Sequence, residues 1–328
     1  MATLWTTAAL WGNRVEPPLL PLLILPAPDF FIPLMIASAL PVLLPRLGTA
    51  IYAGLFVWAV LGDSTRLQPQ FVSFIVLFIA AIPSRREAGR LFARVFLMTF
   101  WFYAGLHKLL SVEFMGSENP YLLAGLIPDA PHWMNVVFPW VAVVAEMGLA
   151  VALFFPAARK LAAAHIAVLH LLIFIALSPL GHDWNSSVWA WNLLLMSAGF
   201  WLFYNWKGRV TAELRSASRA IRLAAVFMVV YPAGFYLGVS DPYLSHALYS
   251  DNIPQARRCD AAGTCSYLQT SSSKINVPLP PRRHVYHDYF RRVCAPGDTL
   301  EIFEYRRVYK SIVGETTSHE CPVPPALR

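Results

Sequence analysis

Two basic side chains, His107 and Lys108, lie near the end of a long apolar segment. They belong to the stretch Phe102–Leu109, and the apolar residues before it extend far enough to cross a bilayer. A cation in hydrocarbon is costly unless it faces a cavity or a partner, so an ionisable residue there is a candidate functional residue. Lys108 could act as a base toward a bound ligand. It could equally extend to the lipid headgroups, because helical rise places it about 5 Å from the outer membrane boundary.

Three polar residues from three apolar runs lie at one predicted depth. Tyr103, His170 and Asn192 come out about 10 to 13 Å below the outer boundary when each run is treated as a helix. At a shared depth they could form one polar pocket, with Trp191 beside Asn192 as a further contact. Together with the two basic residues above them, they define the predicted ligand pocket.

Three ionisable residues lie deeper still. Arg94, Glu146 and His165 come out about 20 to 24 Å below the outer boundary, on three successive runs. A carboxylate in hydrocarbon is either paired or protonated, and the sequence offers Arg94 and His165 as partners at that depth. We therefore expect a buried charge cluster. It could be a structural bridge between helices, a proton route or a contact to substrate.

The elements that must position these residues are apolar helices. Hydrophobic residues make up 57% of the chain and charged residues 14%, and the mean hydropathy is +0.50, which indicates a polytopic membrane protein. Apolar runs of about 20 residues, the length that spans ~30 Å of hydrocarbon, occur at about 28–45, 47–62, 69–83, 88–110, 133–155, 158–179, 186–205 and 220–240. The predicted fold is all-α in the bilayer, with about eight transmembrane helices over residues 28–240.

Segments at the two ends of the chain differ from this bundle. Residues 1–27 are predicted to form an N-terminal interfacial segment, because prolines break the apolar run 18–26. Residues 241–328 form a polar tail. A helix signal at 284–290 and alternating polar and apolar residues from 299 to 313 predict a small α+β cap on the outer face. Such a cap is too small to carry an enzyme core alone.

The distribution of lysine and arginine predicts the orientation. Loops that contain Arg46, Arg90, Arg159 and the basic stretch 207–222 alternate with loops poor in lysine and arginine. Short cytoplasmic loops retain basic residues, so the first set is predicted to lie inside and both termini outside. This distribution also accounts for most of the net charge of +7, and no nucleic-acid partner is expected.

All four cysteines, Cys259, Cys265, Cys294 and Cys321, lie in the polar tail. An even set of cysteines in an extracytoplasmic segment predicts two disulfides. Three pairings are possible, and the favoured one joins Cys259 to Cys265 and Cys294 to Cys321. The spacing fits no zinc site, and no metal is predicted.

Four short motifs of the apolar region, taken together, resemble a known membrane family. They are Tyr103–Leu109, Ala145–Gly148, Leu169–Leu172 and the span containing Trp191-Asn192. Their order and spacing, over roughly residues 45–250, are similar to those of the horizontally transferred transmembrane (HTTM) domain. That domain is the membrane half of vitamin K-dependent γ-carboxylase and of bacterial relatives. The smaller quinol-associated families typified by DoxX and MauE share the aromatic-x-x-Gly-x-x-Lys pattern.

The resemblance implies roles for some of these residues. In the carboxylase, the lysine of the matching motif is the base that deprotonates vitamin K hydroquinone, and this role falls on Lys108. His170 matches a histidine of the family. The implied cofactor is a quinone or hydroquinone, and the implied location is a bacterial-type inner or plasma membrane. The chain departs from the carboxylase at His107, which replaces a second lysine, and in its shorter extracytoplasmic part, which has no room for a propeptide-binding domain.

Three functional hypotheses follow. The first is quinol-dependent oxidation or carboxylation-type modification of a secreted substrate, with Lys108 as base. The second is a non-catalytic membrane partner that binds quinone or lipid and supports a secreted or membrane-bound client protein. The third is a transporter with Arg94, Glu146 and His165 as a proton relay, although the chain shows no internal repeat.

Overall fold

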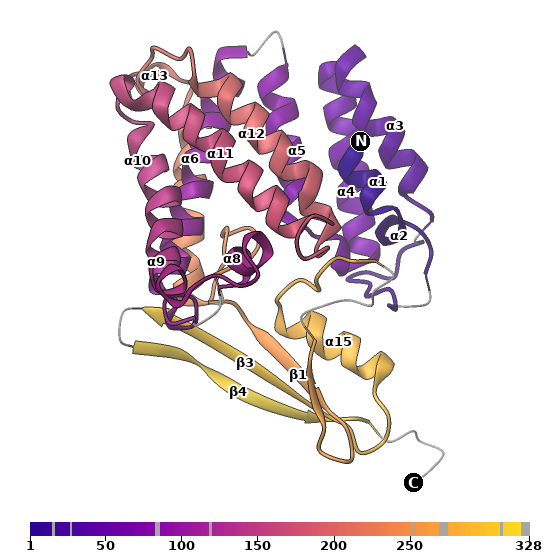
Figure 1. Cartoon of the computed structure of the whole chain (residues 1–328). Coiled ribbons are helices and arrows are strands. Elements are labelled where there is room, and N and C mark those ends of the chain that lie inside the picture. The colour runs from indigo at the N-terminus through magenta and orange to yellow at the C-terminus, as the bar shows by residue number, and fades with distance from the viewer. Residues whose placement is uncertain are drawn as a thin grey trace.

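The chain forms a bundle of helices with a small sheet and one helix at one end of it (Figure 1). The computed structural model describes residues 1–14, 17–26, 28–82, 86–117, 120–250, 252–268, 275–308 and 311–322, and all their side chains except those of residue 86 and of residues 305–308 and 311–315. All the described helices except α15 lie in the first three quarters of the chain, and the strands lie in the tail. The prediction of a mostly helical chain with a C-terminal α+β part is therefore confirmed.

The helices follow one another with mostly short connections, apart from the long segment between α2 and α3. The first half contains α1 Ala2–Thr6, α2 Ala8–Trp11, α3 Phe31–Leu43, α4 Pro45–Gly62, η1 Ser64–Arg66, α5 Pro69–Ala81 and α6 Arg86–Leu110. After it come α7 Val112–Met115, α8 Tyr121–Leu126, α9 His132–Val143, η3 Val144–Gly148, α10 Leu149–Ala152, η4 Pro156–Ala158, α11 Arg159–Leu177, η5 Ser186–Val188, α12 Trp189–Phe203, α13 Val210–Ser216, α14 Arg219–Val230 and η6 Tyr231–Leu237. Proline begins α4 and α5, where its missing N–H would have no helical partner.

Four helical segments in the described part of the chain are long and apolar enough to cross a membrane. They are Pro45–Gly62, His132–Ala152, Pro156–Leu177 and Arg219–Leu237. All eight predicted runs coincide with helical segments, but α3 and α5 have 13 residues each and α12 has 15, too few to span ~30 Å at 1.5 Å per residue. The structure thus supports a membrane protein. It does not support the prediction of eight spans.

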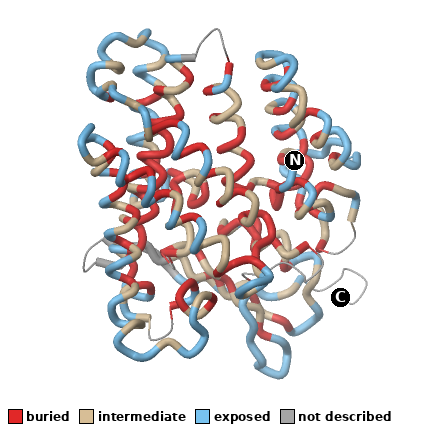
Figure 2. The backbone as a smooth tube through the Cα atoms, turned by 45° about the horizontal axis from the view of Figure 1, so that its top comes forward, coloured by how far each residue is buried: buried red, intermediate tan, exposed pale blue. Residues whose placement is uncertain are grey.

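Helix α6 is the centre of the bundle. It contacts α5, α9, α10, α12, α13 and α14, and side chains such as Leu97 and Trp101 are fully buried. Buried residues concentrate along the inner faces of the helices (Figure 2). Because neighbours surround it, α6 can bury charged side chains against partners instead of exposing them to lipid.

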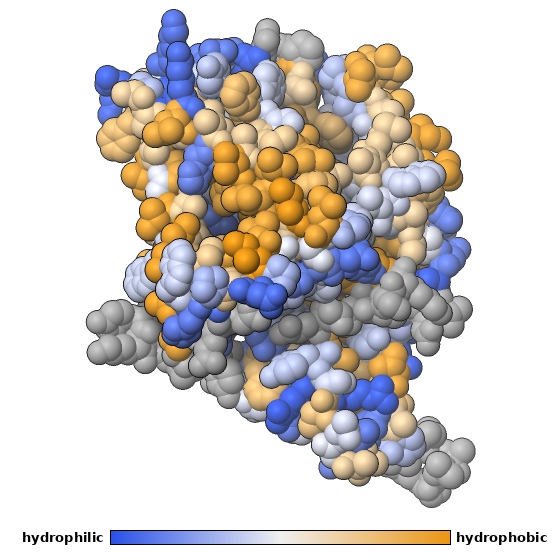
Figure 3. All heavy atoms as spheres, viewed as in Figure 1, coloured by the Kyte–Doolittle hydropathy of each residue, from blue (hydrophilic) through white to orange (hydrophobic). Residues whose placement is uncertain are grey.

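The outer surface of the bundle is apolar. Large exposed side chains include Trp140 on α9, Phe154, and Leu161 on α11. Figure 3 shows apolar residues gathered over the middle of the bundle, with hydrophilic residues toward the α13 end and toward the cap. A belt of this kind would be unfavourable in water and is typical of a lipid-facing surface.

The cap is an antiparallel sheet packed on one helix. Its strands β1 Gln255–Cys259, β2 Cys265–Tyr267, β3 Thr299–Val308 and β4 Ser311–Glu320 lie in the order β2-β1-β3-β4, and the helix is α15 Arg283–Val293. Alternate residues of β1 and β3, Ala256, Leu300 and Ile302, are buried together with Tyr286 and Phe290 of α15. One sheet face thus forms a small apolar core with the helix, as alternation along a strand requires.

Both predicted disulfides are present in the cap. Cys259 pairs with Cys265, which closes the β1–β2 turn, and Cys294 after α15 pairs with Cys321 after β4. The favoured pairing of the four cysteines is confirmed. The second disulfide joins the end of α15 to the end of the edge strand β4, so it links the helix covalently to the sheet.

The N-terminal residues are integrated into the rest of the molecule. Leu4, Leu10 and Trp11, on α1 and α2, are buried in the core of the bundle. In the proline-broken run 18–26, Leu20 packs into the core of the cap. These side chains anchor residues 1–27 in both the bundle and the cap, whereas the large apolar side chains at 22–25 are exposed.

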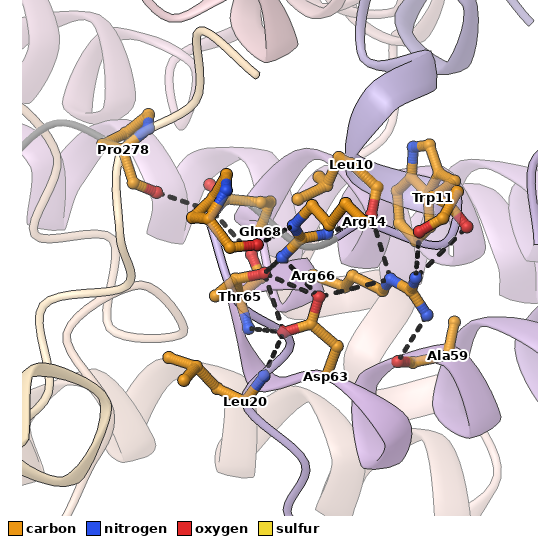
Figure 4. A network of polar contacts seen from close by, with 12 residues as sticks. Leu10, Trp11, Arg14, Leu20, Ala59, Asp63, Thr65, Arg66, Gln68 and Pro278 are labelled. Carbon is orange, nitrogen blue, oxygen red and sulfur yellow. Dashed lines mark hydrogen bonds and ion pairs between the residues drawn. The ribbon is translucent and has the colours of Figure 1, made fainter. Parts of the chain in front are cut away.

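A network of buried polar residues joins these parts at the turn between α4 and α5 (Figure 4). Arg14 Nη2 lies 2.6 Å from Asp63 Oδ2, and Arg66 Nε lies 3.5 Å from the same oxygen. The Arg66 guanidinium also donates to backbone carbonyls of Leu10 and of the two residues that follow it, at 3.0 to 3.2 Å. The Gln68 amide then donates to the cap through the Pro278 carbonyl, at 3.1 Å. We call Arg14, Asp63, Thr65, Arg66 and Gln68 the Asp63 cluster.

Candidate functional site

Lys108 forms a buried ion pair with Glu146. Its Nζ donates to Glu146 Oε2 at 2.7 Å and Oε1 at 3.0 Å, and to the Leu248 carbonyl at 3.2 Å. The exposed fractions of the two side chains are 3% and 10%. Lys108 therefore does not extend to the surface, and the anchor interpretation of this lysine is wrong. The end of α6 is covered by the residues that follow it, including Phe114 on α7, whose ring centre lies 5.9 Å from Nζ.

The position of Glu146 depends on a local change of helix type. Residues Val144–Gly148 form a π-helical turn between α9 and α10. The extra residue in a π turn changes where side chains point, and such turns are frequent at functional sites. Gly105 on α6 faces this turn: a Cβ there would meet Met147 Cγ at 2.6 Å and Glu146 Cβ at 3.1 Å. The Gly105–Lys108 spacing of the motif thus permits the close approach that brings Glu146 to the lysine.

The predicted cluster of Arg94, Glu146 and His165 does not form. Arg94 Nη1 pairs instead with Glu213 Oε2 of α13 at 3.2 Å, and the guanidinium carbon lies 4.5 Å from the centre of the Trp206 ring. His165 is exposed on the outer side of α11. Equal depth does not imply contact, because it fixes the level of a side chain and not the direction in which it points. The proton relay built on these three residues is therefore not supported.

His170 and Asn192 belong to a continuous, linear chain of hydrogen bonds. Trp101 Nε1 donates to His170 Nε2 at 3.0 Å, so the other ring nitrogen, Nδ1, donates to Asn192 Oδ1 at 2.8 Å. The Asn192 amide in turn donates to the Val188 carbonyl at 2.8 Å. The chain links α6, α11 and α12 and uses the polar atoms of the imidazole, so His170 holds helices together and lines no cavity described here.

His107 and Tyr103 are likewise engaged with the protein. His107 Nε2 lies 2.9 Å from the Ser245 carbonyl, which can only accept, so Nε2 carries the proton and the Tyr236 hydroxyl donates to Nδ1 at 2.7 Å. Tyr103 donates to the Val229 carbonyl of α14 at 2.9 Å. The predicted pocket around these residues is thus wrong: packing distributes them over three different contacts of α6.

A pocket lies instead between the cap and the end of the bundle that faces it. Its volume is about 460 Å³. The walls are mainly aromatic and apolar, with Phe114, Tyr121, Trp184 and Tyr249 from the bundle side and Leu279 and Tyr286 from the cap side. Lys108 lies directly behind two lining residues, Phe114 and Leu248, both of which it contacts. The lysine is therefore near this pocket but not part of its wall.

Gln70 is the polar residue that distinguishes this pocket. It lies in the first turn of α5, lines the pocket, and is 0% exposed. Neither its Oε1 nor its Nε2 has a hydrogen-bond partner among the described residues. A buried unpaired amide is costly, and a ligand with one donor and one acceptor would satisfy it once the side chain turns toward the pocket, because neither polar atom is accessible in the ligand-free chain. Trp191 is also buried with its Nε1 unpaired, although it does not line the pocket.

Sequence reasoning missed Gln70, and the available signal was weak. Two glutamines, Gln68 and Gln70, begin an otherwise apolar run. That placement could have marked them as interfacial residues, but it could not show which amide finds a partner. Within the described ranges, no group of three or more His, Cys, Asp or Glu side chains is arranged to hold a metal ion.

Comparison of the chain with protein-family models, curated proteins and solved structures yields no match. The resemblance to the HTTM domain stays a hypothesis based on the four sequence motifs. The function must be argued from the geometry.

Proposed function

We propose that this membrane protein binds an amphipathic ligand with an aromatic, quinone-type head in the pocket between the bundle and the cap. The observation that carries the proposal is Gln70, a fully buried residue that lines the pocket and whose amide has no partner among the residues that the structure describes. A buried polar group is normally paired, and an exception calls for an explanation such as a ligand.

The chemistry of the walls suits such a head group. A quinone carbonyl accepts a hydrogen bond and a hydroquinone hydroxyl donates one, so either form can use one end of the Gln70 amide. The rings of Tyr121 and Trp184 pack edge to face, 5.6 Å apart at 76°, and together give the pocket an aromatic wall. Ligand pockets commonly combine apolar and aromatic walls with a few polar groups that fix orientation.

A second candidate function is deprotonation of a bound hydroquinone, as the HTTM resemblance implies. It is favoured by the position of the Lys108–Glu146 pair directly behind Phe114 and Leu248. Transfer of a proton from the Lys108 ammonium to Glu146 would leave a neutral amine. That amine could accept the phenolic proton of the hydroquinone and return to the ammonium form, with the quinolate as product. If the chain binds the quinone without this proton transfer, it is a non-catalytic membrane partner that supports a client protein.

A paired measurement on the purified full chain tests the binding proposal. Menadione and its hydroquinone serve as probes, and quenching of tryptophan fluorescence reports binding, since Trp184 lines the pocket. Gln70→Met removes the amide at similar volume. We expect weaker binding, by about tenfold, together with a higher unfolding temperature of the ligand-free protein.

The matched control is Gln255→Met, because Gln255 lines the same pocket from β1 but is only half-buried. It should leave both binding and stability nearly unchanged. Lower stability in Gln70→Met, or probe binding equal to that of the unaltered chain, would overturn the proposal.

The base hypothesis has its own test. Arginine keeps the positive charge but cannot release its proton in a protein. Lys108→Arg should therefore retain menadione binding and abolish quinol-dependent oxygen uptake or modification of a client. Full activity in Lys108→Arg would leave binding without catalysis as the function.

We further propose that the cap faces the outside and that all eight helical runs lie within the membrane, with both termini outside. The alternation of basic loops supports this orientation. A thiol reagent that cannot cross membranes should label a cysteine introduced at Ser117, near the cap, and not one at Ser216, at the end of α13. The opposite labelling pattern would reverse the orientation.

A further inference from the structure

A second cavity, separate from the pocket beside the cap, opens along the other part of α6. Its volume is about 700 Å³, and it runs between α6, α10, α13 and α14. Representative lining residues are Met98, Phe102, Val151, Leu214, Ala225 and Val226. Along α14 it extends from Arg222 to Val230, about 12 Å at the helical rise per residue. We call this cavity the α14 groove.

The α14 groove is apolar along its length and basic at one end. Tyr103 is close to its uncharged end, where its hydroxyl is already used by the Val229 carbonyl. Two arginines, Arg215 of α13 and Arg222 of α14, line the other end on either side of the turn that joins these helices. Both are exposed.

The nearby carboxylate does not neutralise these arginines. Glu213 is the acid of α13, and its two oxygens are taken by Arg94 Nη1 at 3.2 Å and by Trp206 Nε1. No ion pair joins Arg215 or Arg222 to an acid within the ranges that the structure describes. The basic end of the α14 groove is therefore a site of uncompensated positive charge beside an apolar channel.

We propose that the α14 groove binds one anionic phospholipid. The two guanidinium groups would donate hydrogen bonds to the phosphodiester, which arginine recognises well through its fork of N–H donors. One acyl chain would lie along the groove against Met98, Val151 and Val226. Charge complementarity at one end and an apolar lining along the rest together specify an amphiphile with an anionic head.

The proposal is more specific than the general attraction of basic loops to anionic lipid. Arg209 and Arg219 flank the same two helices and are also exposed, but they do not line the groove. General attraction would involve all four arginines alike. A bound lipid would depend on Arg215 and Arg222 and on the shape of the groove.

Native mass spectrometry of the full chain, released from nanodiscs of phosphatidylglycerol and phosphatidylcholine, tests this distinction. The double variant R215Q/R222Q should bind phosphatidylglycerol about 100-fold more weakly, since a hydrogen bond from each guanidinium to the charged phosphodiester contributes roughly a tenfold gain. The matched double variant R209Q/R219Q should retain the adduct. Unchanged binding of menadione in both variants would show that the fold and the pocket beside the cap are intact.

A third variant tests the channel. Val226→Trp places a large ring in the groove and leaves all four arginines present, so the phosphatidylglycerol adduct should again be lost. The proposal is overturned by equal losses in the two arginine pairs, by an adduct that survives Val226→Trp, or by equal retention of phosphatidylcholine and phosphatidylglycerol in the unaltered chain.

Discussion

Gln68 of the Asp63 cluster and Gln70 of the pocket wall are only two residues apart and both line the pocket, yet their buried amides differ in hydrogen bonding. In the cluster, the Gln68 amide donates to the carbonyls of Thr65 and Pro278, both at 3.1 Å. At Gln70, the same amide group has no protein partner among the described residues. The two glutamines share a residue type, a helix start and nearly complete burial.

The difference separates structural polar groups from ligand-binding ones. A fully paired cluster stabilises the protein, because each buried group would otherwise be left without the water it lost. An unpaired amide that lines a pocket costs stability in the ligand-free chain. By this criterion His170 and the Asp63 cluster are structural, and Gln70 is the candidate ligand contact of the proposed function.

The largest expected effect comes from breaking the Asp63 cluster. Asp63→Ala leaves the guanidinium groups of Arg14 and Arg66 without their carboxylate, and it removes the acceptor of the Leu20 N–H. We expect a loss of about 5 kcal/mol, the upper end of the range for removing one partner of a buried ion pair. Unfolding of the detergent-solubilised chain, followed by tryptophan fluorescence, measures it. Asp129→Ala, at an exposed acid, is the control, and a comparable loss there would refute the assignment.

Disruption of the Lys108–Glu146 pair should cause an intermediate loss of stability, and the effects of changing the two residues should be coupled. Glu146→Gln keeps one acceptor oxygen but leaves the lysine charge unpaired, and we expect a loss of about 3 kcal/mol. Adding Lys108→Met should restore much of it, because both charges are then gone. Adding Arg94→Leu instead should restore nothing, since Arg94 pairs with Glu213. Rescue by the arginine change would show that the pairing described here is wrong.

A smaller loss is expected for His170→Ala, which leaves Trp101 Nε1 and Asn192 Oδ1 without partners. Unsatisfied buried groups cost about 1–3 kcal/mol each, so we expect a destabilisation of about 2 kcal/mol or more. Menadione binding should stay within twofold of that of the unaltered chain. Weaker menadione binding with unchanged stability in His170→Ala would show that His170 contacts the ligand.

Patterns that depend on one segment could be predicted from the sequence. Apolar runs located the helices, because burial in lipid or core requires a continuous apolar stretch. Alternation of polar and apolar residues located the hairpin, and β3–β4 follows it. The disulfides also followed, since a pair six residues apart closes a tight turn.

The partners of buried charges could not be predicted from depth alone. Shared depth predicts Arg94 and His165 as the partners of Glu146, but the π-helical turn at Val144–Gly148 and the close approach at Gly105 direct it to Lys108. Helical rise puts Lys108 within reach of the headgroups, but Phe114 of α7 packs over the end of α6. Likewise, whether Gln70 is paired depends on residues of the bundle and the cap that are far away in sequence. Helical period and hydropathy do not contain this information.

The smallest effect on stability is expected at a paired carboxylate of the cap, Asp298. Its Oδ2 accepts from the Ala295 N–H at 2.8 Å and from Arg258 Nε at 2.8 Å. The hydrogen bond from Ala295, followed by those from Arg258, holds the pKa of Asp298 below its ordinary value. Because the folded-state pKa is the lower one, the stabilisation is complete above the unfolded-state pKa of about 4 and is lost as the pH falls through the folded-state value.

In the full chain, cleavage of the cap by pepsin should therefore accelerate as the pH is lowered from 5 to about 2. Asp298→Asn removes the titrating group, so its cap should be cleaved faster at pH 5 and should gain less from further acidification. Glu320→Gln, at an exposed acid at the end of β4, should follow the unaltered chain. If Asp298→Asn kept the full pH dependence, the paired carboxylate would not stabilise the cap, and pairing alone would no longer identify a structural residue.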